Sequence, residues 1–355
     1  TEYKLDVIKF KNGRVKFHLD NRLDGFATPV PQKKLITITV ESYNSITNLY
    51  EVVKTISLIQ TYFIKGSDQT SRRLRLDEVQ IKDASATPTP VQTYRFDYNT
   101  QIQLPSTASK ARDYWGYYNG EDGNTGFIKK KKKIDFQASD VAGSTVINLD
   151  IGNGVREPNP NYSQAYILRR IYFPTKGYTD FDYEPNRYQD NTGIKIAGGV
   201  RIRRIKSYNG TDPIPILKTY KYGDGESGYG EKNFFMENSY YSTQVEEHEY
   251  IFDGTISPCL IKTGSRRVRT FFSVPPISFE PYDASSVFYP TVTEYVGSES
   301  INTGKIIYKF TLELDSKQSD FVAGGQPAIF SKHFLRGLLK ERHVFRNDNG
   351  FFRPV

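Results

Sequence analysis

The residues of this chain best suited to chemistry are aromatic and gather in the segment Asp113–Gly120, which reads DYWGYYNG. Aromatic rings beside Asp and Asn can stack on a sugar ring or a nucleobase. The same rings can instead form a buried plug where a loop crosses a β-sheet. We favour the plug and keep the ligand platform as the alternative. The four rings concerned are those of Tyr114, Trp115, Tyr117 and Tyr118.

Acidic residues suggest two further sites, and neither is complete. Asp180, Asp182 and Glu184 alternate and would share one face of a strand. A glycoside hydrolase needs such a pair with one buried member of raised pKa, and no neighbouring residue marks one. The loop Asn119–Asn124 offers oxygen ligands between glycines but lacks the length of an EF-hand, so calcium binding stays open.

Histidines and nucleophiles form no recognisable site. The four histidines are scattered without zinc-ligand spacing, and the sequence has no nucleophile elbow and no phosphate-binding loop. Cys259 is the single cysteine, so an intramolecular disulfide is excluded, and we expect a buried thiol. We therefore expect a protein that is not an enzyme and that uses no cofactor.

Basic residues form the strongest charge run, with five consecutive lysines at Lys129–Lys133. The chain has 48 Lys and Arg against 40 Asp and Glu, a net charge of +8. Basic residues beside aromatics can bind nucleic acid. Lysines on an edge strand explain the run more simply, because they prevent edge-to-edge pairing. We do not expect a nucleic acid partner, and we interpret Arg201, Arg203 and Arg204 as a solvent-facing row.

The elements that would position these residues are antiparallel hairpins. Ile167–Phe173 and Tyr178–Glu184 alternate in polarity around the turn Pro174–Gly177, and many other runs do the same. With 26 Tyr and 23 Phe, the composition favours strands. We predict an all-β fold of antiparallel hairpins that form a large curved sheet or a shell, with little helix. Glycines with positive φ are predicted at the turns: Gly13, Gly177, Gly210 and Gly254.

The domain organisation is predicted from one Pro-rich stretch, Asp83–Thr93, which reads DASATPTPVQT and resembles a linker or a long loop. It divides the chain into an N-terminal β-hairpin region over 1–93 and a second β region over 94–355, although the two could form one continuous structure. No transmembrane run is evident. Because the chain begins at Thr1 rather than Met, we expect a segment of a longer polypeptide.

One stretch, Pro174–Glu184, reads PTKGYTDFDYE and resembles the turn-and-strand unit of YD-repeat, or RHS-like, proteins. The resemblance extends to Tyr94–Asn99, Asp113–Gly120 and Arg156–Pro160. This order is similar to RHS-like regions of very large secreted or cell-surface proteins of Gram-negative bacteria. It covers most of the chain, although the spacing here is irregular whereas regular arrays repeat about every twenty residues.

The resemblance implies a YD-repeat-like β-shell over 94–355 and a role as a scaffold. Such a segment would be non-enzymatic and secreted or at the cell surface. It would enclose or present another domain of the same polypeptide, such as a C-terminal effector or toxin. The alternative is a surface binding or adhesion module for glycans or a protein partner, which would use exposed tyrosine-rich and basic rows.

Overall fold

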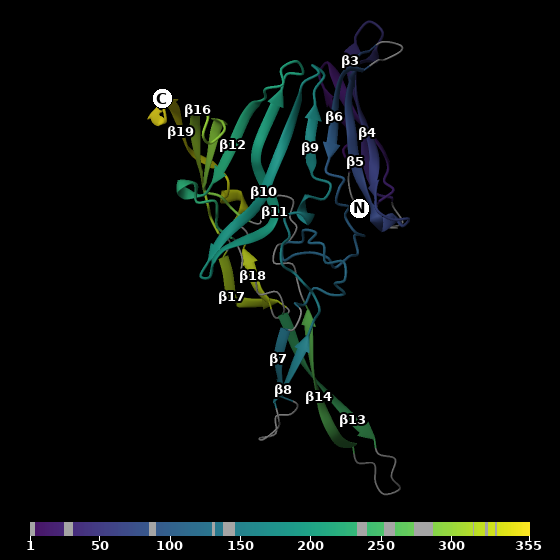
Figure 1. Cartoon of the computed structure of the whole chain (residues 1–355). Coiled ribbons are helices and arrows are strands. Elements are labelled where there is room, and N and C mark those ends of the chain that lie inside the picture. Colours follow the sequence, from purple (N-terminus) through teal and green to yellow (C-terminus); the bar gives the residue numbers. More distant parts are fainter. Residues whose placement is uncertain are drawn as a thin grey trace.

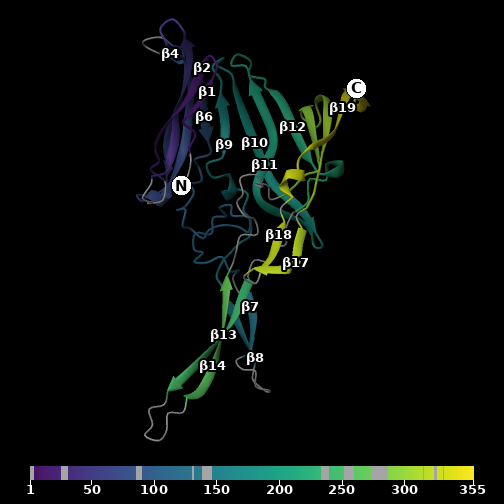
Figure 2. The same ribbon diagram turned by 180° about the vertical axis from the view of Figure 1, so that it is seen from behind.

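The computed structural model is dominated by one open, curved β-sheet (Figure 1). Strands from the first third of the chain form one side of the sheet and strands from the last third form the other (Figure 2). The structure describes residues 4–24, 31–84, 90–129, 132–137, 146–232, 240–251, 260–272, 287–314, 316–323, 326–330 and 332–355.

In this described part of the chain, fourteen strands form the sheet, and every neighbouring pair is antiparallel. The strand order follows the order along the chain. In that order the strands are β1 (Val7–Phe10), β2 (Gly13–Asn21), β3 (Lys33–Asn44), β4 (Leu49–Ile64), β5 (Arg72–Lys82), β6 (Pro90–Tyr98), β9 (Leu168–Tyr172), β10 (Tyr178–Asp190), β11 (Gly193–Tyr208), β12 (Ile216–Tyr222), β15 (Thr291–Gly297), β16 (Asn302–Phe310), β19 (Leu339–Asp348) and β20 (Phe351–Pro354).

The remaining described strands form three two-stranded hairpins, and two of these, β7–β8 and β13–β14, extend below the sheet in both views (Figures 1 and 2). Helical structure in the described residues is limited to four 3₁₀ turns of three residues each. The predicted all-β antiparallel fold with little helix is therefore confirmed. The sheet is open, because β1 and β20 lie at opposite ends of its strand order. The further elements are β7 (Lys132–Gln137), β8 (Val146–Ile151), β13 (Tyr240–Ile251), β14 (Leu260–Phe272), β17 (Ser316–Ala323), β18 (Gln326–Phe330), η1 (Gln69–Ser71), η2 (Tyr162–Gln164), η3 (Asp224–Glu226) and η4 (His333–Leu335).

Cross-strand aromatic pairs fix the register where the sequence pattern is strongest. Tyr178 of β10 lies opposite Tyr172 of β9 on one side and Tyr208 of β11 on the other. The Tyr178 and Tyr208 rings stack with their centroids 4.4 Å apart. The guanidinium of Arg170 lies 4.0 Å from the Tyr178 ring centroid. Such pairs supply most of the specific stabilisation between neighbouring strands.

The two ends of the sheet differ in the connections that they carry. Because neighbouring strands are antiparallel, successive connections alternate between the ends. One end, uppermost in Figure 1, carries the short turns β3–β4, β9–β10, β11–β12, β15–β16 and β19–β20, and we call it the turn end. The other, the insertion end, carries the three long connections at 99–167, 223–290 and 311–338.

The strands β1–β6 have one apolar face and one charged face. Ile38 lies opposite Ile56, and Ile56 lies opposite Ile81 on the next strand, so apolar side chains line up across the sheet. Their neighbours Thr39 and Gln80 point to the opposite, charged face. None of these apolar side chains belongs to the buried core. We call the following half-buried set the apolar face: Val15, Phe17, Ile38, Val40, Ile56, Leu58, Val79, Ile81 and Tyr94.

The sheet runs without a break through the expected boundary between 1–93 and 94–355. That boundary falls inside β6, which pairs with β5 on one side and with β9 on the other. The two regions are therefore joined by a continuous hydrogen-bonded sheet. Residues 85–89 of the Pro-rich stretch lie outside the described residues.

Candidate functional site

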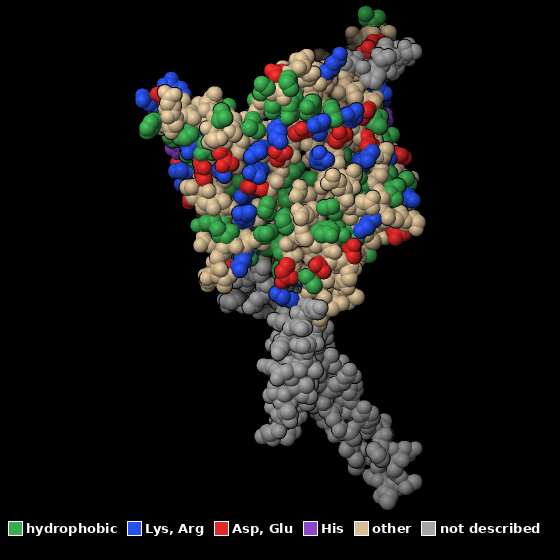
Figure 3. All heavy atoms as spheres, viewed as in Figure 1, with side chains coloured by type: hydrophobic (Ala, Val, Ile, Leu, Met, Phe, Trp, Pro, Cys, Tyr) green, Lys and Arg blue, Asp and Glu red, His purple; other side chains and the backbone are tan. Residues whose placement is uncertain are grey.

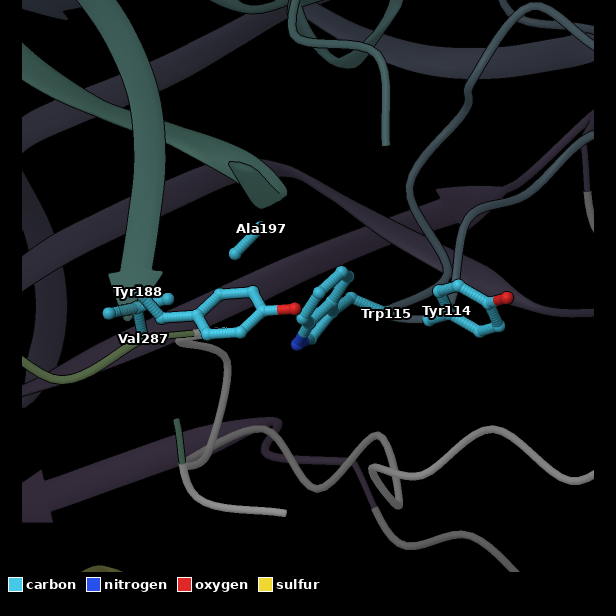
Figure 4. Close-up of a cluster of buried hydrophobic side chains, with 5 residues drawn as sticks. All are labelled: Tyr114, Trp115, Tyr188, Ala197 and Val287. Carbon is cyan, nitrogen blue, oxygen red and sulfur yellow. The ribbon is translucent and has the colours of Figure 1, made fainter. Parts of the chain in front are cut away.

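The aromatic segment Asp113–Gly120 lies in the long connection between β6 and β9, and its rings are largely buried. The exposed fraction is 2% for Trp115, 6% for Tyr114 and 8% for Tyr118, while Tyr117 is partly buried against the same cluster. Figure 4 shows Trp115 between Tyr114 and Tyr188, at ring-centroid distances of 6.3 and 6.1 Å. This burial is what a plug requires.

Asp113 organises the turn that carries these rings. Its Oδ1 atom accepts hydrogen bonds from the backbone N–H groups of Trp115 at 2.9 Å and of Tyr117 at 3.0 Å. The Asp113 N–H donates to the Tyr117 carbonyl at 2.8 Å, and Gly116 between them has a φ of 91°. A side chain that hydrogen-bonds its own turn in this way is typical of Asp, and it holds both rings in one orientation.

Arg156 joins this turn to a second part of the same connection. Its Nη2 atom donates to the Asp113 carbonyl at 2.8 Å, and its Nη1 atom donates to the Phe127 carbonyl at 2.8 Å. The guanidinium also lies 5.3 Å from the Tyr114 ring centroid. Arg156 is 2% exposed, so its charge is satisfied inside the protein by carbonyls and a ring. No pattern in the sequence marks Arg156 as the residue that anchors this turn.

The loop Asn119–Asn124 uses its polar atoms to hold the plug together. The Asn119 and Asn124 amides both donate to the Val155 carbonyl at 2.9 Å, and Asn124 Oδ1 accepts from the Val155 N–H at 2.9 Å. Asp122 accepts a hydrogen bond from the Tyr118 hydroxyl at 3.1 Å. Two of the groups that suggested a calcium loop, the Asn124 Oδ1 atom and the Asp122 carboxylate, are therefore engaged in bonds with other residues of the protein.

The plug lies on β11 where that strand has no side chains. A Cβ atom on Gly198 would be 2.7 Å from Asp113 Oδ2 and 2.8 Å from Trp115 Cβ. A Cβ atom on Gly199, where φ is 74°, would be 2.7 Å from the Tyr117 ring. Both glycines lie inside β11. Glycine within a strand is the signal that could have revealed the contact, because it marks close approach of another backbone.

The Asp113 carboxyl is the most perturbed acid of the plug. Burial raises its pKa to about 7, against the opposing effects of the Tyr117 and Trp115 N–H groups and of Arg156. Asp113 is fully buried, and within the described residues its Oδ2 atom has no hydrogen-bond partner. A raised pKa inside a pocket can mark a catalytic acid. Here the carboxyl is covered by Gly198 and the plug's own turn, so no substrate reaches it.

The predicted turn glycines differ in backbone conformation. Gly210 has a φ of 91°, as expected. The prediction is wrong for Gly13 and Gly177, neither of which has a positive φ, and in the second turn Lys176 takes that conformation at 67°. Both glycines are instead required by close backbone contacts. A Cβ atom would be 2.3 Å from the Glu41 carbonyl at Gly13 and 2.6 Å from the Tyr208 carbonyl at Gly177. Gly254 lies outside the described residues.

The acidic row of β10 is neutralised across the sheet. Asp180 pairs with Arg170, Asp182 with Lys206 at 2.7 Å, and Glu184 with Arg201 at 2.7 Å. A hollow of about 690 Å³ lies beside this row, lined by five basic and five acidic side chains. Figure 3 shows basic and acidic side chains interleaved across the strands on this view of the molecule. The row and the hollow therefore carry no excess of either charge.

Arg201 corrects the prediction of a solvent-facing arginine row. Its side chain is only 9% exposed. The guanidinium lies 4.2 Å from the Tyr222 ring centroid and 4.6 Å from that of Tyr289, and Nη2 also donates to the Gly228 carbonyl. Arg201 is thus a partner of aromatic rings that link β11, β12 and the segment before β15.

Two of the five lysines in the run lie outside the described residues. Lys129 forms an ion pair with Glu157 at 3.1 Å. Lys130 and Lys131 are not described, and the last two lysines belong to β7, which pairs with β8 on one side. Cys259 is likewise outside the described residues. Protection of a sheet edge by this run stays a prediction.

Comparison with known proteins identifies no family for the chain. No protein-family model and no curated protein matches it. Within the described residues, no group of three or more His, Cys, Asp or Glu side chains is arranged to hold a metal ion. No helix among those residues is long and apolar enough to cross a membrane.

Proposed function

We propose that this chain is a non-enzymatic β-scaffold segment of an RHS-like secreted or cell-surface bacterial protein. It would enclose or present another domain of the same polypeptide, such as a C-terminal effector. The observation that carries the proposal is the apolar face of β1–β6. Antiparallel sheets normally bury one such face under a second layer. A scaffold that is completed by further polypeptide would explain why the side chains of this apolar face are only half-buried in the segment alone.

The apolar face is continuous rather than a scatter of single residues. In-register neighbours such as Phe17, Ile38, Ile56 and Ile81 run across β2 to β5. Each residue of the apolar face is half-buried, so part of its apolar surface remains open to a covering layer. A covering domain in the same polypeptide would dock with a high effective concentration, because the linker keeps it close.

Two further features support a scaffold over an enzyme. The carboxylates that could have formed an acid pair are held by Arg170, Lys206 and Arg201 in cross-strand ion pairs. Asp113, whose pKa is raised to about 7 by burial, is covered and hydrogen-bonded to its own turn. These groups stabilise the sheet and its plug and are not positioned to act on a substrate.

The alternative, a glycan-binding module, is weakened by the placement of the plug. A sugar platform needs an exposed ring face, and Trp115 is 2% exposed. Binding there would require the plug to leave β11. A glycan or protein partner would therefore have to use another surface.

The scaffold proposal is tested with the longer polypeptide that contains this segment. Limited proteolysis should leave the domain that follows it protected. Ile38→Lys with Val79→Lys, on the apolar face, should abolish this protection, because charge cannot be buried there. Thr39→Lys with Gln80→Lys places the same charges one residue along, on the charged face, and should preserve it. Equal protease sensitivity of all three proteins would refute enclosure by this face.

A further inference from the structure

The turn end of the sheet carries the most exposed large apolar side chains in the described chain. Apart from Val355, the last residue, every such side chain that is more than 70% exposed lies at this end. Figure 3 shows hydrophobic side chains along the upper edge of the molecule, where Figure 1 places the short turns. The exposed fractions are 90% for Ile46, 82% for Ile301, 77% for Ile214, 74% for Phe351 and 71% for Ile216. We call these residues the apolar tips.

In four of the turns that carry the tips, one backbone N–H is bonded within the turn. A side-chain oxygen from within the turn accepts the hydrogen bond of the N–H at the tip or beside it. Each of these bonds lowers the cost of moving that N–H group into an apolar environment. These bonds run from Ile46 N to Asn44 Oδ1 at 2.9 Å, Ile214 N to Asp212 Oδ1 at 2.9 Å, Ile301 N to Ser298 Oγ at 2.9 Å and Gly350 N to Asn347 Oδ1 at 2.8 Å.

Two acidic residues near the tips form ion pairs. Glu299, beside Ile301, pairs with Lys221 at 2.9 Å. Asp348, near Phe351, pairs with Arg353 at 3.2 Å. The tips therefore present aliphatic and aromatic side chains beside charged residues that are partly paired.

We propose that the turn end binds the interfacial region of a lipid bilayer, with the apolar tips inserted among the lipids. The tips belong to separate turns and are divided by polar residues such as Asn48, Asn209 and Ser300. A protein interface needs a contiguous, closely packed core. A bilayer has no such requirement, because each inserted side chain buries its own apolar area.

Flotation of the 355-residue chain with phosphatidylcholine vesicles tests this proposal. The tip variant combines Ile46→Ser, Ile214→Ser, Ile301→Ser and Phe351→Ser. Its control combines four substitutions at the insertion end, at side chains that are 53 to 55% exposed: Leu23→Ser, Ile64→Ser, Ile194→Ser and Leu338→Ser. We expect wild type and control to float equally and the tip variant to lose about tenfold or more in partitioning. Wild-type protein that stays at the bottom, or equal losses in both variants, would overturn the proposal.

A fluorescence measurement with single substitutions tests the same proposal without the risk that a fourfold variant misfolds. Ile46→Trp places a tryptophan at a tip, and Ile194→Trp places one at the insertion end, each above the same background from buried Trp115. Brominated phosphatidylcholine should quench the first and leave the second unchanged. Equal quenching of both, or of neither, contradicts insertion of the tips. This result is independent of enclosure by the apolar face, which the vesicle experiment does not involve.

Discussion

Trp115 lies directly on Gly198 of β11, so close that a Cβ atom on the glycine would be 2.8 Å from the Trp115 Cβ. The long connection between β6 and β9 is thereby held against a strand that is distant from it in sequence. The contact depends on two features at once: a tryptophan presented by the Asp113 turn and a strand position without a side chain. The following predictions start from this contact.

Gly198→Ala should destabilise the protein by about 1–3 kcal/mol, because the new methyl group overlaps Asp113 Oδ2 and Trp115 Cβ in a closely packed site. Gly123→Ala is the matched control, since a Cβ atom there has no neighbour within 4 Å. Urea unfolding of both variants and wild type measures the difference. Equal midpoints for the two variants would show that the plug does not rest on Gly198.

Trp115→Ala should cost about 3–5 kcal/mol, the usual range for removing a large buried aromatic side chain. Iodide should quench the fluorescence of the single tryptophan only weakly, because the ring is 2% exposed. Strong quenching together with an unchanged melting temperature would be incompatible with a plug. That pair of results would favour the ligand-platform interpretation.

The buried Asp113 carboxyl should make the protein less stable as the pH rises towards 7. Burial raises its pKa from 3.8 to about 7, so between these values the folded protein holds a proton that the unfolded chain has lost. The stabilisation from this group is therefore full below pH 3.8 and is lost as the pH rises towards 7. Asp113→Asn keeps an oxygen acceptor for the two backbone N–H groups but cannot titrate.

The measurement is the difference in unfolding free energy between wild type and Asp113→Asn across this pH range. Wild type should lose stability relative to the variant as the pH rises. A constant difference would mean that the carboxyl does not titrate in that range. A difference of the opposite sign would mean that the folded protein holds the ionised form.

Gly13→Val and Gly177→Val should each destabilise the protein by about 1–3 kcal/mol through collision with a backbone carbonyl. The mechanism differs from a positive-φ turn, and Ala distinguishes the two. Because the collision involves Cβ itself, Ala should already cause most of the loss at both positions. Gly66→Ala is the control, since its Cβ atom would make ordinary contacts at 3.5 Å. Ala variants with wild-type melting temperatures would contradict the close-contact explanation.

The sheet could be predicted from sequence because its determinants are local. Alternation around Asn12-Gly13 and around Pro174–Gly177 predicts β1–β2 and β9–β10, and register pairing then follows from neighbours along the chain. The predicted positive φ at Gly13 and Gly177 was wrong, because these glycines are required by contacts with residues distant in sequence. The carbonyl of Glu41 on β3 leaves no room for a side chain at Gly13. No pattern within the first hairpin reveals this contact.

The sequence predicts that the aromatic residues of the plug cluster together, but it does not predict which residues bury them. The composition of Asp113–Gly120 marks rings that need burial, but the partners that bury them come from three distant places: Arg156, Gly198 and Val287. Arg201 illustrates the same limit. An alternating pattern assigns it to a solvent-facing row, and only the rings of Tyr222 and Tyr289 explain why it is buried.

The central claim is that further polypeptide covers the apolar face of β1–β6, and cysteine labelling tests it most directly. In a Cys259→Ser background, Ile38→Cys reports on the apolar face and its neighbour Thr39→Cys reports on the charged face. We predict that the Ile38→Cys thiol reacts readily in this segment alone and at least tenfold more slowly in the complete polypeptide, while Thr39→Cys reacts at similar rates in both. An equally reactive Ile38→Cys thiol in the complete polypeptide would contradict the scaffold proposal.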